Sequence, residues 1–251
     1  MTQPLFDDAL RALRLQRARR KGPALFLAER ACEDIEDRLT LVQRRFRRAL
    51  LIGLPDPSWA DRFRPASEEV HAIASLADLA SVEPGSFDLC LVLGQFDTVN
   101  DLPFFLRIVR AALESDALAV GAFPGNESLP ALRTAMLAAD QAGGGGVSPR
   151  IHPRIEASAF AALLQEAGFT MPVVDIDRIR LRYRRLDDLV ADLRAMGATN
   201  VLLNRSRRPL TRSTLDAARE AFGALGDESG TLETVELIHF AAWTGSTAPP
   251  W

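Results

Sequence analysis

The sequence predicts an α/β fold in which helices cover both faces of a doubly wound, mostly parallel sheet. Two short and continuously apolar runs, residues 49–53 and 87–94, have the pattern of central strands that are buried on both faces. From residue 87 onward, apolar runs alternate with helical segments of about 10–15 residues, an order typical of a parallel sheet with helical crossovers. We expect residues 1–48 to form an N-terminal helical extension and residues 49–245 to form one structural unit.

Two amphipathic helices are predicted before the first strand. Apolar residues recur at a spacing of three to four over residues 5–20 and again over 24–42, and Gly22-Pro23 separates the two segments. The run 49–53 then ends on Gly53, and only residues 69–74 have the composition of a strand before the run 87–94. The pattern leaves open whether this intervening strand is the second or the third of the sheet.

The remaining elements follow in a regular order. Asp101 stands at the start of one helix, Asn126 is placed to cap the next, and Gly168 ends a third. The elements predicted after residue 94 are helix 101–113, strand 117–123, helix 127–142, helix 156–167, strand 171–183, helix 186–196, helix 211–225 and strand 232–243.

Composition and charge exclude several classes of function. A net charge of −3 and a pI of about 5.7 give no reason to expect nucleic acid or an anionic membrane surface as a partner. No apolar run approaches the ~20 residues of a membrane span, and the first residues lack the order of a secretory signal, so we expect a cytoplasmic protein. Cys32 and Cys90 lie in apolar patterns and are predicted to be buried thiols. The three histidines are too scattered to predict a metal site.

A ligand of a doubly wound sheet is expected over the carboxyl ends of its strands, where glycines let the backbone approach phosphate or nucleoside groups. Here the loop after the first strand, residues 53–59, contains one glycine, and Pro55 and Pro57 remove two backbone donors. A plain strand-to-helix turn, capped by Asp56 or Ser58, explains these residues better than a glycine-rich cradle does.

The length of the chain in this region gives the same result. Between Gly53 and Asp88 lie 34 residues, whereas two further strands and three crossovers require roughly 40–46 residues. At least one strand or helix is therefore missing or reduced to loop. An acid about 20 residues past the glycine would normally hold the ribose hydroxyls, yet around Ile73 the sequence has no acid until Asp78. Gly53, Asp78 and Phe96 are the candidate cofactor-binding residues, although an aromatic residue beside a strand end is more often a packing residue.

The second half of the chain resembles a known family. The motifs that carry the resemblance, in chain order, are Pro84-Gly-Ser-Phe-Asp-Leu89, Val99-Asn-Asp-Leu-Pro103, Gly121-Ala-Phe-Pro-Gly-Asn-Glu-Ser-Leu129, Ser148-Pro-Arg-Ile-His-Pro153 and the segment 188–204 with Arg194-Ala-Met-Gly-Ala-Thr-Asn200. They are similar to methyltransferase-type proteins related to mitochondrial complex I assembly factor 5 and, more distantly, to the malonyl-carrier-protein methyltransferase of biotin synthesis.

The resemblance implies a seven-stranded class I methyltransferase fold that usually depends on S-adenosylmethionine. For the assembly-factor branch it implies hydroxylation of an arginine of a complex I subunit. The chain departs from the family in its glycine-poor first loop, in the missing strand region, and at Phe96-Asp97-Thr98, where relatives usually carry a Leu-His-Trp-like stretch. All three departures fall at the expected cofactor pocket.

Two residues are candidates for catalysis. His152 lies in a proline-flanked loop that is expected to lie over the strand ends, where a neutral imidazole can exchange protons near pH 7. Tyr183 stands at the end of a predicted strand, where its hydroxyl can reach a substrate. The alternatives are a loop histidine that packs a lid and a tyrosine at the edge of the core.

Four residues are candidates for binding a substrate or a partner. Arg150 and Arg154 flank the histidine loop and can hold a carboxylate or phosphate through two hydrogen bonds each. Asn204 and Arg205 open a basic turn that continues through Arg207 and Arg208 and that can face an acidic partner. In each case the alternative is a solvated surface charge.

These observations define two main hypotheses. The chain is a methyltransferase-family protein that transfers a methyl group from S-adenosylmethionine at a degenerate site, of which Gly53 and Asp78 are remnants, working mainly by proximity and orientation. Alternatively it is a non-catalytic scaffold or assembly factor, a pseudoenzyme that binds a protein partner in respiratory-complex assembly. A hydroxylase, a third hypothesis by analogy, finds no metal-binding triad in the sequence. Fold alone does not choose among them.

Overall fold

The computed structural model describes residues 3–245 and divides the chain into two compact units. The sheet unit consists of Phe26–Gly125, Ile155–Asp177 and the described residues from Leu237 onward. The helical unit consists of the described residues up to Leu25, Asn126–Arg154 and Arg178–Glu236. Two long strands contribute residues to both units. The extent of the methyltransferase-like region, residues 49–245, stays a prediction.

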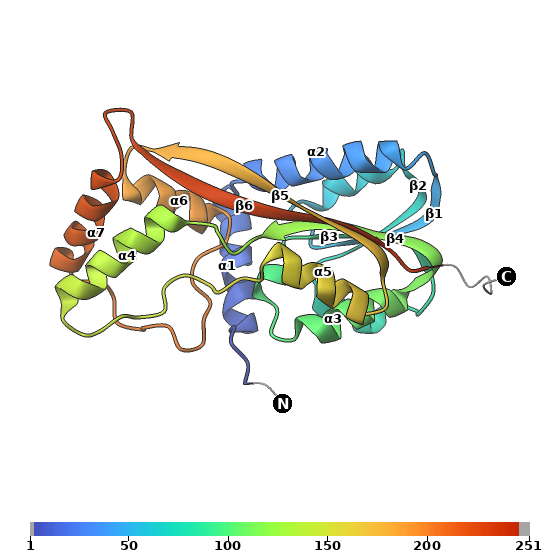
Figure 1. The fold of residues 1–251 in the computed structure, drawn as a ribbon, viewed down its shortest axis with the longest axis horizontal. Coiled ribbons are helices and arrows are strands. Elements are labelled where there is room, and N and C mark those ends of the chain that lie inside the picture. The colour runs from blue at the N-terminus through green and yellow to red at the C-terminus, as the bar shows by residue number, and fades with distance from the viewer. Residues whose placement is uncertain (1–2, 246–251) are drawn as a thin grey trace. The chain divides into compact units, whose positions relative to one another are not determined.

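The strands form a six-stranded sheet in the order β2-β1-β3-β4-β6-β5 (Figure 1). Their bounds are β1 Phe46–Ile52, β2 Ser67–Ile73, β3 Phe87–Leu93, β4 Leu113–Pro124, β5 Thr170–Tyr183 and β6 Thr231–Trp243. β1 pairs in parallel with β2 and β3, and β3 pairs in parallel with β4, whereas β4 and β6 are antiparallel. The predicted α/β class with a mostly parallel sheet is confirmed.

The shortened first half is confirmed as well. β2 lies directly beside β1, which is the place of the second strand in a doubly wound sheet, so the strand that is reduced is the outer third one. The connections around β2 are 3-10 helices, η1 (Pro57–Phe63) and η2 (Leu76–Ser81), in place of α-helical crossovers. Because these connections are short, the few residues between β1 and β3 suffice.

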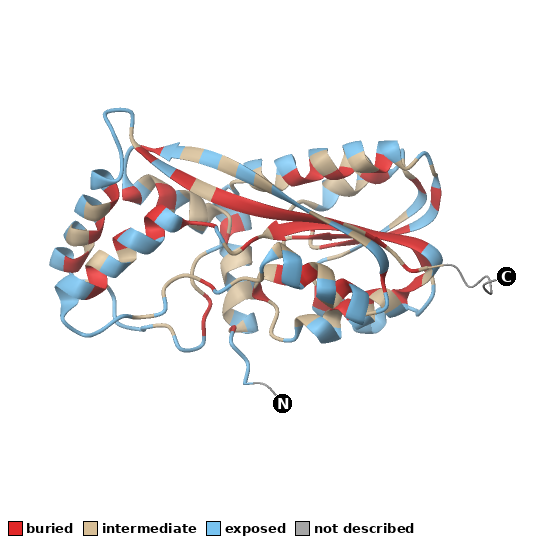
Figure 2. Ribbon diagram, viewed as in Figure 1, coloured by how far each residue is buried: buried red, intermediate tan, exposed pale blue. Residues whose placement is uncertain are grey.

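In the sheet unit, helices cover both faces of the sheet. α2 (Phe26–Leu41) lies on one face, and α3 (Leu102–Ala112) and α5 (Ala157–Glu166) lie together on the other (Figure 1). β3 is buried along its whole length, as the continuous apolar run 87–94 predicts (Figure 2). Cys32 on α2 and Cys90 on β3 are free and fully buried, and burial raises the pKa of both thiols, that of Cys32 to about 12. The prediction of two core thiols is confirmed.

The helical unit packs four helices with the remaining halves of β5 and β6. The helices are α1 (Asp8–Lys21), α4 (Pro130–Gly143), α6 (Leu186–Ala195) and α7 (Arg212–Ala224). α4 packs along α7, and α1 packs against α6. A small core of Phe6, Val201 and Leu202 joins the segment before α1 to the loop after α6, and the backbone N–H of Asp7 donates to the carbonyl of Val201 at 2.9 Å.

One predicted helix start is wrong. Asn126 does not cap the helix that follows it, because α4 begins at Pro130 and its N-cap residue is Leu129. The N–H groups at this end are instead bound by a carboxylate from β6: Glu233 accepts from Leu132 at 2.8 Å and from Ala131 at 3.2 Å. Glu233 is fully buried. A cap that comes from a strand about a hundred residues away leaves no local signal in the sequence.

Candidate functional site

The first candidate region is the strand-end edge of the sheet unit, the residues that follow the carboxyl ends of β1, β2 and β3. Gly53 follows β1 with φ +82° and donates its N–H to the carbonyl of Ile73 at 3.1 Å. A Cβ atom at Gly53 would lie 2.3 Å from the side-chain nitrogen of Gln95 and 2.6 Å from the carbonyl oxygen of Leu93. Gln95 itself is buried. The space that this glycine would offer a ligand is thus taken by the protein's own amide.

Phe96 and Asp78 also have structural partners. The Phe96 ring is buried and packs at centroid distances of 5.8–5.9 Å against Phe123, Phe160 and Phe240. Asp78 is exposed, and its Oδ2 accepts from the N–H and the hydroxyl of Ser75 in a capping box at the start of η2. β2 ends at Ile73, and the next residues are Ala74 and Ser75, so no acid stands directly at its end. The cofactor-binding roles of Gly53, Asp78 and Phe96 stay predictions.

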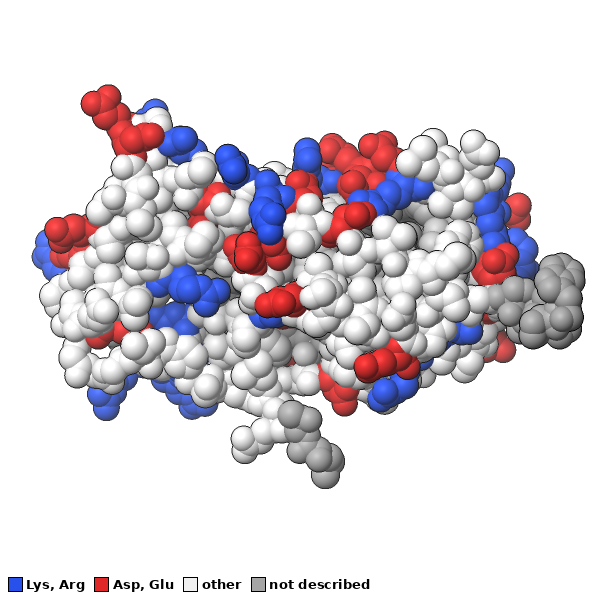
Figure 3. Space-filling view, viewed as in Figure 1, with Lys and Arg blue, Asp and Glu red and all other residues white. Residues whose placement is uncertain are grey.

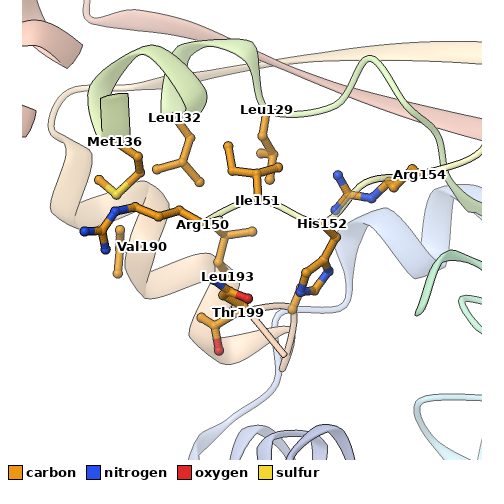
Figure 4. Close-up of a pocket in the computed structure, with 12 residues that line it drawn as sticks. Leu129, Leu132, Met136, Arg150, Ile151, His152, Arg154, Val190, Leu193 and Thr199 are labelled. Carbon is orange, nitrogen blue, oxygen red and sulfur yellow. The ribbon is translucent and has the colours of Figure 1, made fainter. Parts of the chain in front are cut away.

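The second candidate region is a cavity of about 130 Å³ inside the helical unit (Figure 4). α4, the loop 150–154, α6 and the loop 198–200 form its walls. Most of the lining is apolar: Leu129, Leu132, Met136, Ile151, Val190 and Leu193. The polar part of the lining is Arg150, His152, Arg154, Thr199 and Asn200. The structure therefore brings three of the predicted site residues, Arg150, His152 and Arg154, to one cavity.

Arg150 is held by a buried acid. Its Nε donates to Asp140 on α4 at 2.9 Å, and Asp140 also accepts from the N–H of Ser148 at 2.9 Å. Burial alone would raise the pKa of Asp140, but the hydrogen bonds from Arg150 and Ser148 outweigh it and hold the pKa below its ordinary value. In Figure 4 the Arg150 guanidinium lies toward Met136 and Val190. Arg150 therefore fixes the wall of the cavity.

His152 is a buried histidine in a positive environment. Its Nε2 accepts the N–H of Val201 at 2.9 Å, and its ring meets Phe6 edge to face. Burial, followed by the charges of Arg154, Arg14 and Arg11, lowers the pKa of His152 to about 4. The ring is neutral at pH 7 with its proton on Nδ1, because Nε2 is an acceptor. His152 therefore packs and positions the loop, as the alternative to a catalytic role predicts, and its catalytic role stays a prediction.

The other candidate residues do not line this cavity. Tyr183 is buried at the end of β5 and donates its hydroxyl to Asp192 at 3.0 Å; burial raises its pKa. Arg205 donates to the carbonyl of Leu202 at 2.7 Å and lies 3.4 Å from Asp7, so it ties the chain before α1 to the basic turn. Asn204 is exposed. Their functional roles stay predictions.

Three residues that shape these two regions were not identified from the sequence. Gln95 is the second residue after β3, and its place after Gly94 was the available signal. Met136 lies four residues after Leu132, so both side chains are on the same face of α4, and both line the cavity. Asn200 donates from Nδ2 to the carbonyl of Pro149 at 2.8 Å and joins the two loops of the cavity. That contact joins residues 51 positions apart and has no local signature.

Outside these regions the charged side chains are mixed. Acidic and basic side chains lie next to each other over α2 (Figure 3), where Arg30 pairs with Asp177 and Arg38 with Asp175. Within residues 3–245, no group of three metal-ligating side chains is close enough to hold an ion. In the same range, no helix combines the length and hydropathy needed to cross a bilayer.

No protein-family model matches the chain. In sequence it is 29% identical over 241 residues to arginine-hydroxylase NDUFAF5, mitochondrial, of Danio rerio, covering 87% of this chain and 75% of the relative. It is 31% identical over 179 residues to the protein of the same name from Mus musculus, covering 70% and 52%. It is 27% identical over 165 residues to malonyl-[acyl-carrier protein] O-methyltransferase of Laribacter hongkongensis, covering 66% and 54%. The chain thus spans about half the length of the latter two relatives.

Among solved structures, a provisionally assigned methyltransferase from Bacillus halodurans superposes with a TM-score of 0.53 at 10% identity, over 84% of this chain and 99% of that one. This likeness shows the fold. The chain therefore has the fold of the class I methyltransferases. In sequence it is similar to proteins named arginine-hydroxylase NDUFAF5 and malonyl-[acyl-carrier protein] O-methyltransferase.

Proposed function

We propose that the chain is a methyltransferase-fold protein whose nucleoside site is degenerate and that acts in the cytoplasm as a scaffold or assembly factor for a protein partner. The observation that carries the proposal is the Gln95 side chain beside Gly53. A glycine at this point of the fold serves the approach of a ligand to the backbone. Here a Cβ atom at Gly53 would lie 2.3 Å from the side-chain nitrogen of Gln95, so this side of the glycine is occupied.

Two further observations support the degenerate site. No acid stands directly at the end of β2, and Asp78 uses its carboxylate to cap η2. Phe96, the aromatic candidate for stacking on adenine, has its ring in the core. We infer that the residues of the strand-end edge do not fit S-adenosylmethionine.

Calorimetric titration of the purified chain with S-adenosylmethionine tests this inference. We expect no heat of binding up to millimolar ligand. Saturable binding at micromolar concentration would show that the site is not degenerate, and it would favour an enzyme. S-adenosylhomocysteine serves as the second ligand, because it shares the nucleoside and lacks the sulfonium charge.

Methyl transfer from S-adenosylmethionine is the second candidate function. One observation favours it: Gly94, which follows β3, has φ +59° and nothing within 4 Å of the place where a Cβ would stand. The end of β3 is thus less crowded than that of β1. In this case the chain would act by holding the methyl donor against the acceptor atom, with proximity as the main source of rate.

The partner side of the proposal rests on the resemblance to the complex I assembly factor 5 branch and on the basic turn. Arg207 and Arg208 are exposed, whereas Arg205 is fixed by Asp7 and Leu202. We therefore expect Arg207 and Arg208 to carry the attraction to an acidic partner from respiratory-complex assembly, and we expect Arg205 to shape the turn.

A capture experiment tests the basic turn. The tagged chain and its Arg207→Glu/Arg208→Glu variant are used to capture complex I subunits, which mass spectrometry then identifies. We expect the variant to lose the captured subunit. The matched control is Arg180→Glu/Arg184→Glu, which changes the net charge equally at two exposed arginines of β5 and the following residue. Unchanged capture by the first variant removes the basic turn from the proposal.

A further inference from the structure

We propose that the cavity of the helical unit binds a small, neutral molecule with an apolar body, of about the size of benzene or of a short alcohol. All residues that line the cavity belong to the helical unit. None of them belongs to the strand-end edge or to the basic turn. The site is therefore independent of the proposed function, which rests on those two regions.

The size of the cavity sets the size of the ligand. Protein interiors are packed about as densely as organic crystals, and spaces larger than a water molecule are few in each domain. A space of about 130 Å³ is close to an engineered apolar cavity of about 150 Å³ that stays dry and takes up benzene. A ligand of this size also restores the contacts that apolar side chains lose when they face an empty space.

Apolar side chains from two helices and one loop make most of the wall. Leu132 and Met136 come from α4 and Leu193 from α6 (Figure 4), and Ile151 comes from the loop 150–154. Leu132 is buried, whereas Met136 and Leu193 are half-buried, so a ligand can enter from solvent between the two helices. The flexible thioether of Met136 adapts to ligands of different shape. Such walls suit an apolar body and give no partner to a sugar or a nucleobase.

The charged groups of the lining are engaged by the protein itself, and this selects a neutral ligand. Arg150 binds Asp140, and Arg154 has its own interaction within the protein. His152 is neutral, and its Nε2 accepts the N–H of Val201. None of the described residues that line the cavity is acidic, so a cation finds no counter-charge there. Moving a charged group from water to a place without a free counter-charge is unfavourable.

Polar contacts between distant segments keep the walls in place. Asn200 donates from Nδ2 to the carbonyl of Pro149 at 2.8 Å, and its Oδ1 accepts the N–H of Leu202 at 2.9 Å. Leu129, which lines the cavity, stands at φ +64°, a left-handed conformation that is strained for a leucine. Strain of this kind persists only where the surrounding structure holds it. Because the walls are fixed before a ligand arrives, binding loses little conformational entropy.

Two-dimensional NMR of the ¹⁵N-labelled chain, titrated with benzene and with 1-pentanol, tests the proposal. We expect saturable shifts at residues 129–136, 150–154 and 198–200, with a dissociation constant of about 1 mM. Met136→Trp is expected to abolish binding, because the larger ring fills the cavity. Leu137→Trp is the matched control: Leu137 is the next residue of α4, is 42% exposed and does not line the cavity, so this variant is expected to bind as the wild type does.

Pentylammonium and butanoate, which are close to 1-pentanol in size, test the neutral class. We expect each ion to bind at least about tenfold more weakly than 1-pentanol, because its charge has no free partner in the cavity. Equal or tighter binding of either ion would overturn the neutral class.

Two results would overturn the whole proposal. One is the absence of saturable binding of both benzene and 1-pentanol up to the solubility of each, and the other is unchanged binding by Met136→Trp. If Met136→Trp does not fold, Val190→Phe fills the cavity from α6 and decides the matter in the same way. None of these outcomes depends on S-adenosylmethionine or on a captured partner.

Discussion

The strand-end edge of the sheet unit and the cavity of the helical unit differ in what their own side chains do. At the strand-end edge, Gln95 stands beside the one glycine of the first loop, and Phe96 joins the core. In the helical unit, polar residues hold the walls apart and leave about 130 Å³ between them. A fold survives the loss of its ligand because the buried apolar positions still pack, and nearby side chains then close the space.

The largest expected effect tests whether Phe96 belongs to the core or to a ligand. Phe96→Ala is expected to lower the free energy of unfolding by about 3–5 kcal/mol, because the ring is buried against three other phenylalanines. Urea denaturation followed by circular dichroism measures the change. Phe104→Ala on α3 is the matched control, since its ring is 45% exposed, and we expect a loss of about 1 kcal/mol or less.

If both variants lose the same small amount, Phe96 is not a core residue in solution. The strand-end edge would then not be filled by its own side chains, and the Phe96 ring would be available for stacking on a nucleobase.

The first half of the fold was predictable because the signals were local. Continuous apolar runs gave the buried strands, and chain length gave the missing element, since a parallel crossover has a minimum length. The side-by-side placement of β2 and β1 was not predictable from the run 69–74, because a strand's neighbours are set by pairing across the sheet and not by its own composition.

The candidate site was predictable only in part, for the same physical reason. Arg150, His152 and Arg154 share one short loop, so their meeting at one cavity follows from their spacing. The cap from Glu233 to α4 and the bond from Asn200 to Pro149 join distant segments. Burial raises the pKa of Glu233 despite its backbone hydrogen bonds, an effect that exists only in the folded chain.

The next effect in size concerns the positive environment of the cavity. Burial and three arginines hold the pKa of His152 at about 4, against an ordinary value of 6.5. The unfolded chain therefore binds a proton between pH 6.5 and 4 that the folded chain does not. The free energy of unfolding is expected to fall by about 3 kcal/mol as the pH decreases through this window.

His152→Gln removes the titrating group while keeping a hydrogen-bond acceptor for Val201. We expect the variant to be less stable than the wild type at pH 7 but to show a flatter dependence of the unfolding free energy between pH 6.5 and 4. Urea denaturation at several pH values measures both curves. Parallel curves would mean that His152 is not buried among positive charges in solution.

The smallest effect is the coupling between Gly53 and Gln95, and it tests the closure of the strand-end edge most directly. Gly53→Ala is expected to be destabilising for three reasons: φ +82° strains an alanine, and its Cβ would lie 2.3 Å from the Gln95 side-chain nitrogen and 2.6 Å from the Leu93 carbonyl oxygen. Gln95→Ala removes the contact with the Gln95 side chain and leaves the other two. The loss of unfolding free energy caused by Gly53→Ala should therefore be smaller by about 1 kcal/mol in the Gln95→Ala background.

Gly85→Ala is the control, because Gly85 also has a positive φ but no neighbour within 4 Å of an added Cβ. Its effect on the free energy of unfolding should add to that of Gln95→Ala. Additive costs at Gly53 and Gln95 would mean that the amide does not occupy this space in solution. The first loop would then be open to a ligand, and both regions of the molecule would offer space to one.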